Sequence, residues 1–310
     1  MENECNYVSS RGLLKSTDIH MLNPESSSQH LDPTIYSKIQ CGSTVYVCNS
    51  AIRMFRDTIL PLVSVPFVLV SGDSDNAMPS GAFSEEEFTA FINDSRISHW
   101  FCQNLMISHP KMTHIPIGLD YHTMSKLGES HPWGKGKVPV DQEKELSQAI
   151  LDAPPSRERH LYCYSNFHHA TFGIGSRGDR QEVIAKVPKD IVFYDPVFTS
   201  RDIAWNHQSF FSFVLSPKGG GYDCHRTWEA LCLGCIPIVK SSGLNPLFEG
   251  LPVLLLNDWS EVTRDLLIQT LVKFASQSFQ KEKLLLSYWT DLFRQESEEC
   301  HQRVSANSPL

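Results

Sequence analysis

Three consecutive glycines, residues 219–221, stand directly before a short apolar-patterned segment that carries Arg226 and Glu229. Backbone N–H groups at a glycine turn and at the start of a helix attract anions, and the helix dipole adds to this attraction. Arg226 can form a bidentate contact with phosphate. Glu229, three residues further along the same helix face, can accept hydrogen bonds from ribose hydroxyls. These residue types at this spacing predict a nucleotide diphosphate site.

Simpler explanations of the same residues remain open. The glycines can form only a tight turn, and Arg226 with Glu229 can form a surface ion pair worth about 0.2–0.5 kcal/mol. The loop at 219–221 has neither the GxxxxGK[ST] spacing of a P-loop nor the GxGxxG spacing of a dinucleotide-binding loop, and the chain shows GxGxxG only in GIGSRG at 173–178. For this loop a kinase, an ATPase or a dinucleotide oxidoreductase is therefore disfavoured. The succession of strand, glycine loop, helix and strand favours the diphosphate interpretation.

Other cations can help to hold an anion in a chain whose net charge is −8. Such a charge disfavours general binding of nucleic acid, because phosphate backbones need a basic surface. We therefore expect a local cationic cluster. Lys218 and His225 flank the glycines, and Lys240 closes the next strand. We assign them, together with Gly219, Gly220 and Gly221, to the part of the site that binds the nucleotide diphosphate, called the donor side below.

Carboxylates and a histidine follow two apolar stretches earlier in the chain. Asp73 and Asp75 lie in SGDSD, and Asp120 and His122 lie in GLDYH. Ligands of α/β proteins bind at the carboxyl ends of parallel strands, so these residues are candidates for the acceptor side of a site. The alternatives are local turn hydrogen bonds for the aspartates and capping of a following helix for Asp120 and His122.

Short apolar strands alternate with helical stretches along the chain, which predicts parallel sheets covered by helices. We expect strands at 44–49, 67–72, 99–104 and 114–118, then at 161–167, 191–195, 212–216, 236–240 and 253–258. Expected helices are 52–62, 84–93 (opened by a Ser84–Glu87 capping box), 224–233 (capped by Asp223 and closed by Gly234), 260–274 and 281–298.

Two successive series of this kind indicate an α/β protein with two Rossmann-like domains facing across a cleft, the GT-B arrangement. Residues 1–155 form the expected acceptor-side domain, of which 1–42 are irregular and wrap the surface. Residues 126–155 look like a linker, and residues 156–280 form the expected nucleotide-sugar domain. The helix within 281–310 is expected to cross back onto the first domain.

The segment 213–263, FVLSPKGGGYDCHRTWEALCLGCIPIVKSSGLNPLFEGLPVLLLNDWSEVT, resembles the nucleotide-sugar half of exostosin-like glycosyltransferases. Its most specific part is R-x-x-E-A-x-x-x-G-C-I-P, residues 226–237, supported by the N-D-W at 257–259. The similarity extends upstream through VPFVLVSGDSD (65–75), HWFCQN (99–104) and HIPIGLDYHT (114–123). Over about residues 44–265 the chain is similar to the small transferases with which large algal viruses glycosylate their capsid.

The resemblance implies an inverting, metal-independent GT-B enzyme that transfers a sugar from a UDP-sugar to a glycan hydroxyl, with xylose as the guess for the sugar. It also implies that Arg180, in GSRGDRQEV, faces the donor phosphates, ahead of Arg177. Asp73 is the expected general base, since an inverting transfer needs one beside the acceptor. No cofactor beyond the UDP-sugar co-substrate is expected.

Several alternatives stay open. Asp73 and Asp75 also match the D-x-D metal motif of the GT-A class, and retention of configuration is not excluded by residue types. A non-catalytic nucleotide-sugar or glycan-binding module, or a nucleotide-sugar epimerase or phosphatase, would use similar residues. His168 and His169 with Cys163 match no zinc spacing, so no structural metal is expected.

The bulk properties of the chain suit an ordinary globular protein. Its 310 residues are enough for two domains, and it contains 41 % hydrophobic and 20 % charged residues. No apolar run reaches the length of a membrane helix, and the first residues are acidic, unlike the anchored Golgi relatives. Nine cysteines, odd in number and scattered apart from the single C-x-x-C at Cys232 and Cys235, indicate free thiols. We expect a cytoplasmic enzyme, in the host cytoplasm if it is viral.

Overall fold

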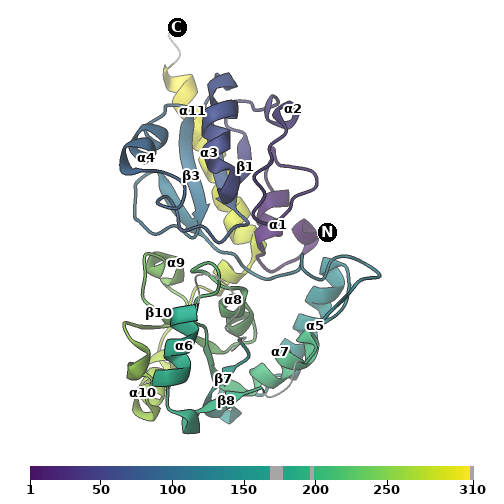
Figure 1. Ribbon diagram of the computed structural model, residues 1–310, viewed down its shortest axis with the longest axis vertical. Coiled ribbons are helices and arrows are strands. Elements are labelled where there is room, and N and C mark those ends of the chain that lie inside the picture. Colours follow the sequence, from purple (N-terminus) through teal and green to yellow (C-terminus); the bar gives the residue numbers. More distant parts are fainter. Residues whose placement is uncertain (168–176, 196–198, 308–310) are drawn as a thin grey trace.

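The computed structural model describes residues 1–167, 177–195 and 199–307, and each half of the chain has its own parallel sheet. The first sheet is ordered β1 (Thr44–Cys48), β2 (Phe67–Gly72), β3 (Ile97–Gln103), β4 (Met112–Ile115). The second is ordered β11 (Leu254–Leu256), β10 (Ile236–Lys240), β9 (Phe211–Leu215), β7 (His160–Ser165), β8 (Val192–Tyr194). Figure 1 shows the two bodies one above the other. The predicted pair of Rossmann-like domains is confirmed.

Helices cover the first sheet on both faces. These are α1 (Ser10–Lys15), α2 (Pro33–Tyr36), α3 (Ile52–Met54, continued by π and 3-10 turns to Leu62) and α4 (Glu85–Ile92). The capping box predicted at the start of α4 is present, with Ser84 Oγ accepting from the N–H of Glu87. All six residues of β2 are buried, as the unbroken apolar run of a sheet covered on both faces requires.

The second sheet is surrounded by α6 (Arg177–Lys186), α7 (Arg201–Ser209), α8 (His225–Cys232), α9 (Asn245–Phe248) and α10 (Arg264–Ala275). Helix α8 ends as predicted, with Gly234 at a φ of +73° and the N–H of Cys235 donating to the carbonyl of Ala230. Its start differs from the prediction. Cys224 is the N-cap residue and Asp223 does not cap the helix, because its carboxylate is used by other donors.

The expectation of a linker at residues 126–155 is wrong. This stretch contains a short hairpin, β5 (Ser130–His131) with β6 (Gly134–Lys135), and the helix α5 (Pro139–Asp152). Leu146 and Ala149 bury one face of α5, which packs against α7 of the second domain. Figure 1 shows α5 and α7 together at one side of the molecule. The domain boundaries at 155 and 280 stay predictions.

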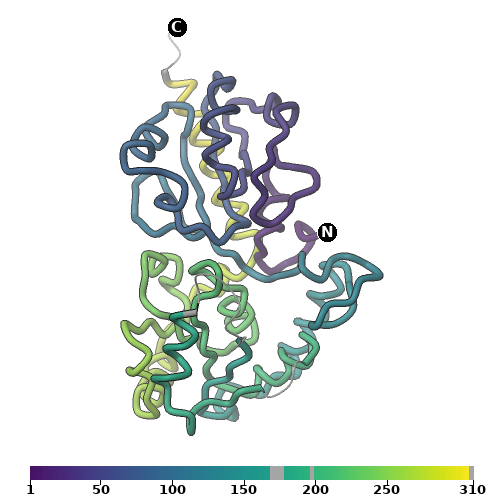
Figure 2. Tube along the Cα trace, viewed as in Figure 1, coloured from purple at the N-terminus to yellow at the C-terminus, as the bar shows by residue number. Residues whose placement is uncertain are grey.

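The last helix, α11 (Leu286–Asn307), leaves the second domain and runs along the first sheet. Phe293 packs on Phe101 with ring centroids 4.7 Å apart, and Ser297 Oγ donates to the carbonyl of Gly42. Figure 2 shows this C-terminal tube passing behind the first domain. The crossing ties the two domains together.

The first 42 residues do more than wrap the surface, which corrects the prediction. Val8, Leu13 and Leu14 are buried in the main core. The N–H of Val8 donates to the carbonyl of Leu284, just before α11, and Tyr7 bridges to Leu285. The N-terminal segment is thus held between the first domain and the start of the last helix.

Candidate functional site

Three strands of the first sheet end at the edge that faces the second domain, and each is followed by a residue with positive φ. These are Asp73 (+53°), Asn104 (+54°) and Gly118 (+63°). Asn104 Oδ1 accepts a hydrogen bond from the N–H of Asp223 in the second domain, at 2.9 Å. Non-glycine residues in this conformation are uncommon and concentrate at functional sites. The carboxyl edge of the first sheet therefore forms one wall of the candidate site.

The carboxylate of Asp73 is buried and already has partners. Its Oδ2 lies 3.4 Å from Arg11 Nε, and its Oδ1 accepts from Ser26 Oγ at 3.1 Å. Only 6 % of the residue is exposed. Arg11 and Ser26 come from the segment expected to be irregular, and sequence reasoning missed both. No local motif marks them, since their partner lies far along the chain.

Asp120 and His122 form a carboxylate–imidazole pair beside Asp73, so these predicted acceptor-side residues do come together. Asp120 Oδ1 lies 3.2 Å from His122 Nδ1 and accepts from the N–H of Thr123 at 2.9 Å. Burial opposes ionisation of Asp120, but His225, His122 and Thr123 hold its pKa well below the usual range. The aspartate is therefore an anion that orients the imidazole.

Asp75 does not join this acceptor-side group. Its carboxylate lies against the glycine loop of the other domain, so close that a Cβ on Gly220 would come within 2.0 Å of Asp75 Oδ2. A Cβ on Gly221 would lie 2.9 Å from Asn104 Nδ2. These two glycines allow the backbones of the two domains to approach each other, which is a specific reason for their presence.

Arg226 lies beneath the glycine loop. Its Nη1 donates to the carbonyl of Pro217 at 3.2 Å, and its guanidinium lies 5.6 Å from the centre of the Phe167 ring. Among the described residues Arg226 makes no ion pair with Glu229 within 4 Å, so the surface ion-pair alternative is wrong. Burial lowers the pKa of Arg226, and Arg180 acts in the same direction, against Cys224 and Glu229.

Arg180 also reaches this loop. Its Nη2 lies 3.6 Å from the position that a Cβ on Gly219 would take. Two guanidinium groups thus lie at the segment 217–219, Arg226 against Pro217 and Arg180 against Gly219, at the carboxyl end of the second sheet, where the predicted phosphates would sit. Like charges held close together in a partly buried crevice favour an anion between them.

A cavity of about 360 Å³ adjoins this crevice and contains two predicted donor residues, Lys218 and Lys240. Lys218 Nζ lies 4.6 Å from the centre of the Tyr222 ring, and Lys240 Nζ lies 3.0 Å from Glu182 Oε2. Sequence reasoning missed Tyr222 and Glu182. Tyr222 directly follows the glycines, and an aromatic residue there is a signal for base stacking that the sequence contained.

His225 and Glu229 are placed differently from the other predicted donor residues. His225 Nδ1 donates to the carbonyl of Gly118 in the first domain, at 2.7 Å, and its ring lies 5.9 Å from that of His122. His225 therefore stands at the domain boundary. Glu229 is half-buried on α8 and does not line the 360 Å³ cavity.

Asp223 is a buried carboxylate at the same boundary. Its Oδ2 accepts from the N–H of Ile117 in the first domain, at 2.7 Å, and both of its oxygens accept from Trp228 Nε1. Burial raises the pKa of Asp223 to about 6. The start of α8 is in this way fixed to the first domain by Asp223, Asn104 and His225.

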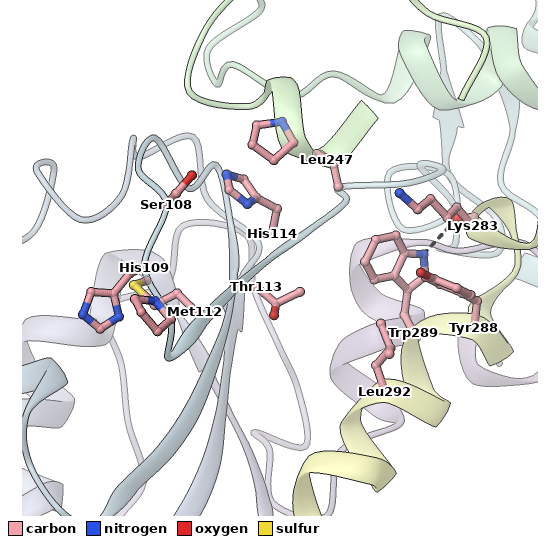
Figure 3. Close-up of a pocket in the computed structure, with 12 residues that line it drawn as sticks. Ser108, His109, Met112, Thr113, His114, Leu247, Lys283, Tyr288, Trp289 and Leu292 are labelled. Carbon is pink, nitrogen blue, oxygen red and sulfur yellow. Dashed lines mark hydrogen bonds between the residues drawn. The ribbon is translucent and has the colours of Figure 1, made fainter. Parts of the chain in front are cut away.

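The larger cavity, about 520 Å³, lies elsewhere, between β4, α9 and the start of α11 (Figure 3). Its polar groups serve the structure around it. His114 Nε2 contacts the carbonyl of Gly243 at 3.0 Å, Lys283 Nζ donates to the carbonyl of Glu249, and Trp289 Nε1 donates to the carbonyl of Lys283. None of the predicted site residues lines this cavity.

Residues 1–167, 177–195 and 199–307 hold no group of three or more histidine, cysteine, aspartate or glutamate residues arranged for a metal ion. None of their helices is long and apolar enough to cross a bilayer. His168, His169 and the side chain of Arg177 lie outside the described residues.

No protein-family model matches the chain, and no curated protein does. Among solved structures it is similar to HepE from Anabaena in complex with UDP, with 12 % identity, TM-score 0.40, and 85 % of this chain and 77 % of that chain covered. It is also similar to a UDP-forming α,α-trehalose-phosphate synthase from Burkholderia xenovorans in complex with glucose-6-phosphate, with 9 % identity, TM-score 0.39, and coverage of 86 % and 76 %. At TM-scores below 0.5 these likenesses carry no argument about activity.

Proposed function

We propose that the protein is a glycosyltransferase that takes a sugar from a UDP-sugar and transfers it to a hydroxyl of a glycan. The observation that carries the proposal is the convergence of Arg226 and Arg180 on the glycine loop, opposite the carboxylate and histidine cluster of the first domain. A cationic crevice suits a diphosphate, and hydrogen-bonding carboxylates across the domain boundary suit sugar hydroxyls.

In this proposal the second domain stabilises the leaving UDP. Arg226, Arg180 and the N–H groups of the glycine loop surround the charge that develops on the diphosphate as the bond to the sugar breaks. Lys218, Lys240 and Tyr222 line the neighbouring cavity, which would hold the rest of the nucleotide. These cations can balance the diphosphate charge, which supports transfer without a metal ion.

The positions of the two SGDSD carboxylates also support metal independence. Asp73 pairs with Arg11, whereas Asp75 lies against Gly220 of the other domain. Carboxylates with such separate partners do not chelate one ion together. Inversion is proposed because the acceptor side carries groups that can take up a proton.

The proposals for the transferred sugar and for the origin of the protein rest on the resemblance of residues 213–263 to exostosin-like transferases. That resemblance, including the similarity to capsid-glycan transferases of large algal viruses, is the reason for proposing xylose as the sugar and a viral origin. The enzyme would then act in the host cytoplasm.

Thermal shift and turnover with a panel of nucleotide sugars test the proposal. UDP and UDP-sugars should raise the Tm, with or without EDTA, and a glycan acceptor should give UDP release and a product of inverted anomeric configuration by NMR. Stabilisation by GDP-sugars alone would exclude the UDP assignment. Binding without any transfer, or conversion of the sugar without an acceptor, would favour the binding module or the epimerase or phosphatase.

A further inference from the structure

Asp73, the base expected from the sequence, is poorly placed to take a proton. Its Oδ2 lies 3.4 Å from Arg11 Nε, its Oδ1 is contacted by Ser26 Oγ, and it is almost completely buried. An acceptor hydroxyl would have to displace these neighbours to reach it. The group that deprotonates the acceptor must be sought among its neighbours.

The charges around His122 favour one tautomer of its ring. The anionic oxygen Asp120 Oδ1 lies 3.2 Å from Nδ1, which favours hydrogen on Nδ1 and the lone pair on Nε2. The atom facing Nε2 is Ser26 Oγ, at 3.3 Å. The Ser26 hydroxyl has a single proton, with Asp73 Oδ1 at 3.1 Å and Nε2 at 3.3 Å. With hydrogen on Nδ1, Nε2 is the acceptor in its contact with Ser26, and an acceptor hydroxyl in the place of Ser26 would donate to it in the same way.

His122 also lies where the two halves of the reaction would meet. Its ring centroid is 5.9 Å from that of His225, in the first turn of α8, the helix that carries Arg226. On its other side are Arg11 and Asp73 of the acceptor wall. His225 also keeps a lone pair on Nε2, because its Nδ1 donates to the carbonyl of Gly118; what distinguishes His122 is the carboxylate of Asp120 beside its Nδ1.

We propose that His122 is the general base of the transfer and that Asp120 positions it; this inference rests on the function proposed above. The acceptor oxygen attacks the anomeric carbon of the donor, the bond from that carbon to the UDP oxygen breaks, and the acceptor proton moves to His122 Nε2. The products are the glycoside, UDP and an imidazolium held by Asp120. Asp73 then serves to fix Arg11 and Ser26.

His207 provides a matched control. It forms a similar pair with Asp195, with Nδ1 at 3.1 Å from Oδ2, but it is 46 % exposed and lies on α7. In Figure 1, α7 lies beside α5 at one side of the second domain. H207Q removes an imidazole from a histidine–aspartate pair outside the proposed chemistry, so it should leave turnover unchanged.

The first measurement needs no substrate. Imidazole ¹⁵N NMR of the ligand-free protein should show His122 protonated on Nδ1, with a pKa below the ordinary 6.5. Burial lowers this pKa, Asp120 and Asp73 raise it, and His225 and Arg11 lower it. A neutral ring protonated on Nε2 would overturn the inference whatever the protein's function is.

The second measurement is turnover with a donor and acceptor that the wild type uses. H122Q should lower kcat by about 10²–10⁴-fold while UDP affinity stays within a few-fold, D120N should also lower kcat, and imidazole should restore activity to H122A. D73N should lose less than H122Q. The inference is wrong if D73N is the more damaged variant or if H122Q turns over normally. Absence of both UDP binding and transfer in the wild type refutes the proposed function and the role of His122 with it.

Discussion

Replacing Arg226 with methionine should separate the binding of UDP from the stability of the ligand-free protein. The guanidinium lies in a crevice with Arg180 nearby, and burial and Arg180 lower its pKa. Methionine keeps the apolar contact with Phe167 and removes the charge. The free energy of unfolding without ligand should therefore be unchanged or slightly higher in R226M.

UDP binding should weaken at the same time. A hydrogen bond to a charged group is worth about 1.5–3 kcal/mol, so the Kd for UDP should rise by about 10–150-fold. At a UDP concentration of 100 times the wild-type Kd, the wild type gains about 2.7 kcal/mol of stability from the ligand. R226M should then gain only about 0.3–1.4 kcal/mol.

Isothermal titration with UDP and urea unfolding with and without UDP measure both effects. R264M is the matched control, because Arg264 also lies over an aromatic ring, 5.5 Å from the centre of Tyr162, but at the start of α10. R264M should bind UDP like the wild type. Equal UDP affinity in R226M and the wild type would refute the assignment of the diphosphate to this crevice.

Three further substitutions test contacts between separate parts of the chain. G220A places a Cβ 2.0 Å from Asp75 Oδ2 and should lower the free energy of unfolding in urea by about 1–3 kcal/mol. The G220A/D75A double variant should recover this loss, and a double variant whose loss equals the sum of the two single losses would contradict the reasoning. Burial raises the pKa of Asp223 to about 6, so between about pH 4 and 6 the folded state holds more protons than the unfolded state. The contribution of Asp223 to the stability therefore falls as the pH rises through that window. D223N should remove that part of the slope, seen as the difference between wild-type and variant Tm against pH, and an unchanged slope would disprove it. E143A removes the acceptor of four hydrogen-bond donors, including Tyr121 Oη. It should lower the free energy of unfolding by at least about 2 kcal/mol and expose the N-terminal segment to proteolysis. Wild-type protease resistance in E143A would contradict this.

Elements with a strong local signal were predicted from the sequence almost to the residue. The bounds of β2 and β10 match the apolar runs at 67–72 and 236–240, and the capping box fixed the start of α4. The glycine loop with Arg226 was also found, because loop, helix and strand follow one another directly. Short-range patterns carry this information by themselves.

What the sequence did not reveal depends on long-range partners. Helix α5 was taken for a linker because its buried face includes polar residues, Gln142 and Glu143, beside the apolar Leu146 and Ala149. Glu143 is buried because its acceptor oxygens serve Asn6 and Tyr7, more than 130 residues away. The contact of Arg11 with Asp73 also joins distant parts of the chain. Residue types alone therefore did not show which carboxylate or histidine to propose as the base.

The docking of residues 6–8 has a consequence for the order in which the molecule matures during synthesis. The carbonyl of Asn6 and the N–H of Val8 bond with Leu286 and Leu284, which leave the ribosome almost 280 residues later. Arg11 follows this docked stretch, so its place beside Asp73 is secured only once the chain has been made as far as Leu286. The glycine loop and its arginines depend on β9 and α8 and can form earlier. A nascent chain should therefore form the crevice at the glycine loop before the wall around Asp73, and the proposed catalysis would have to wait until the start of α11 has been made.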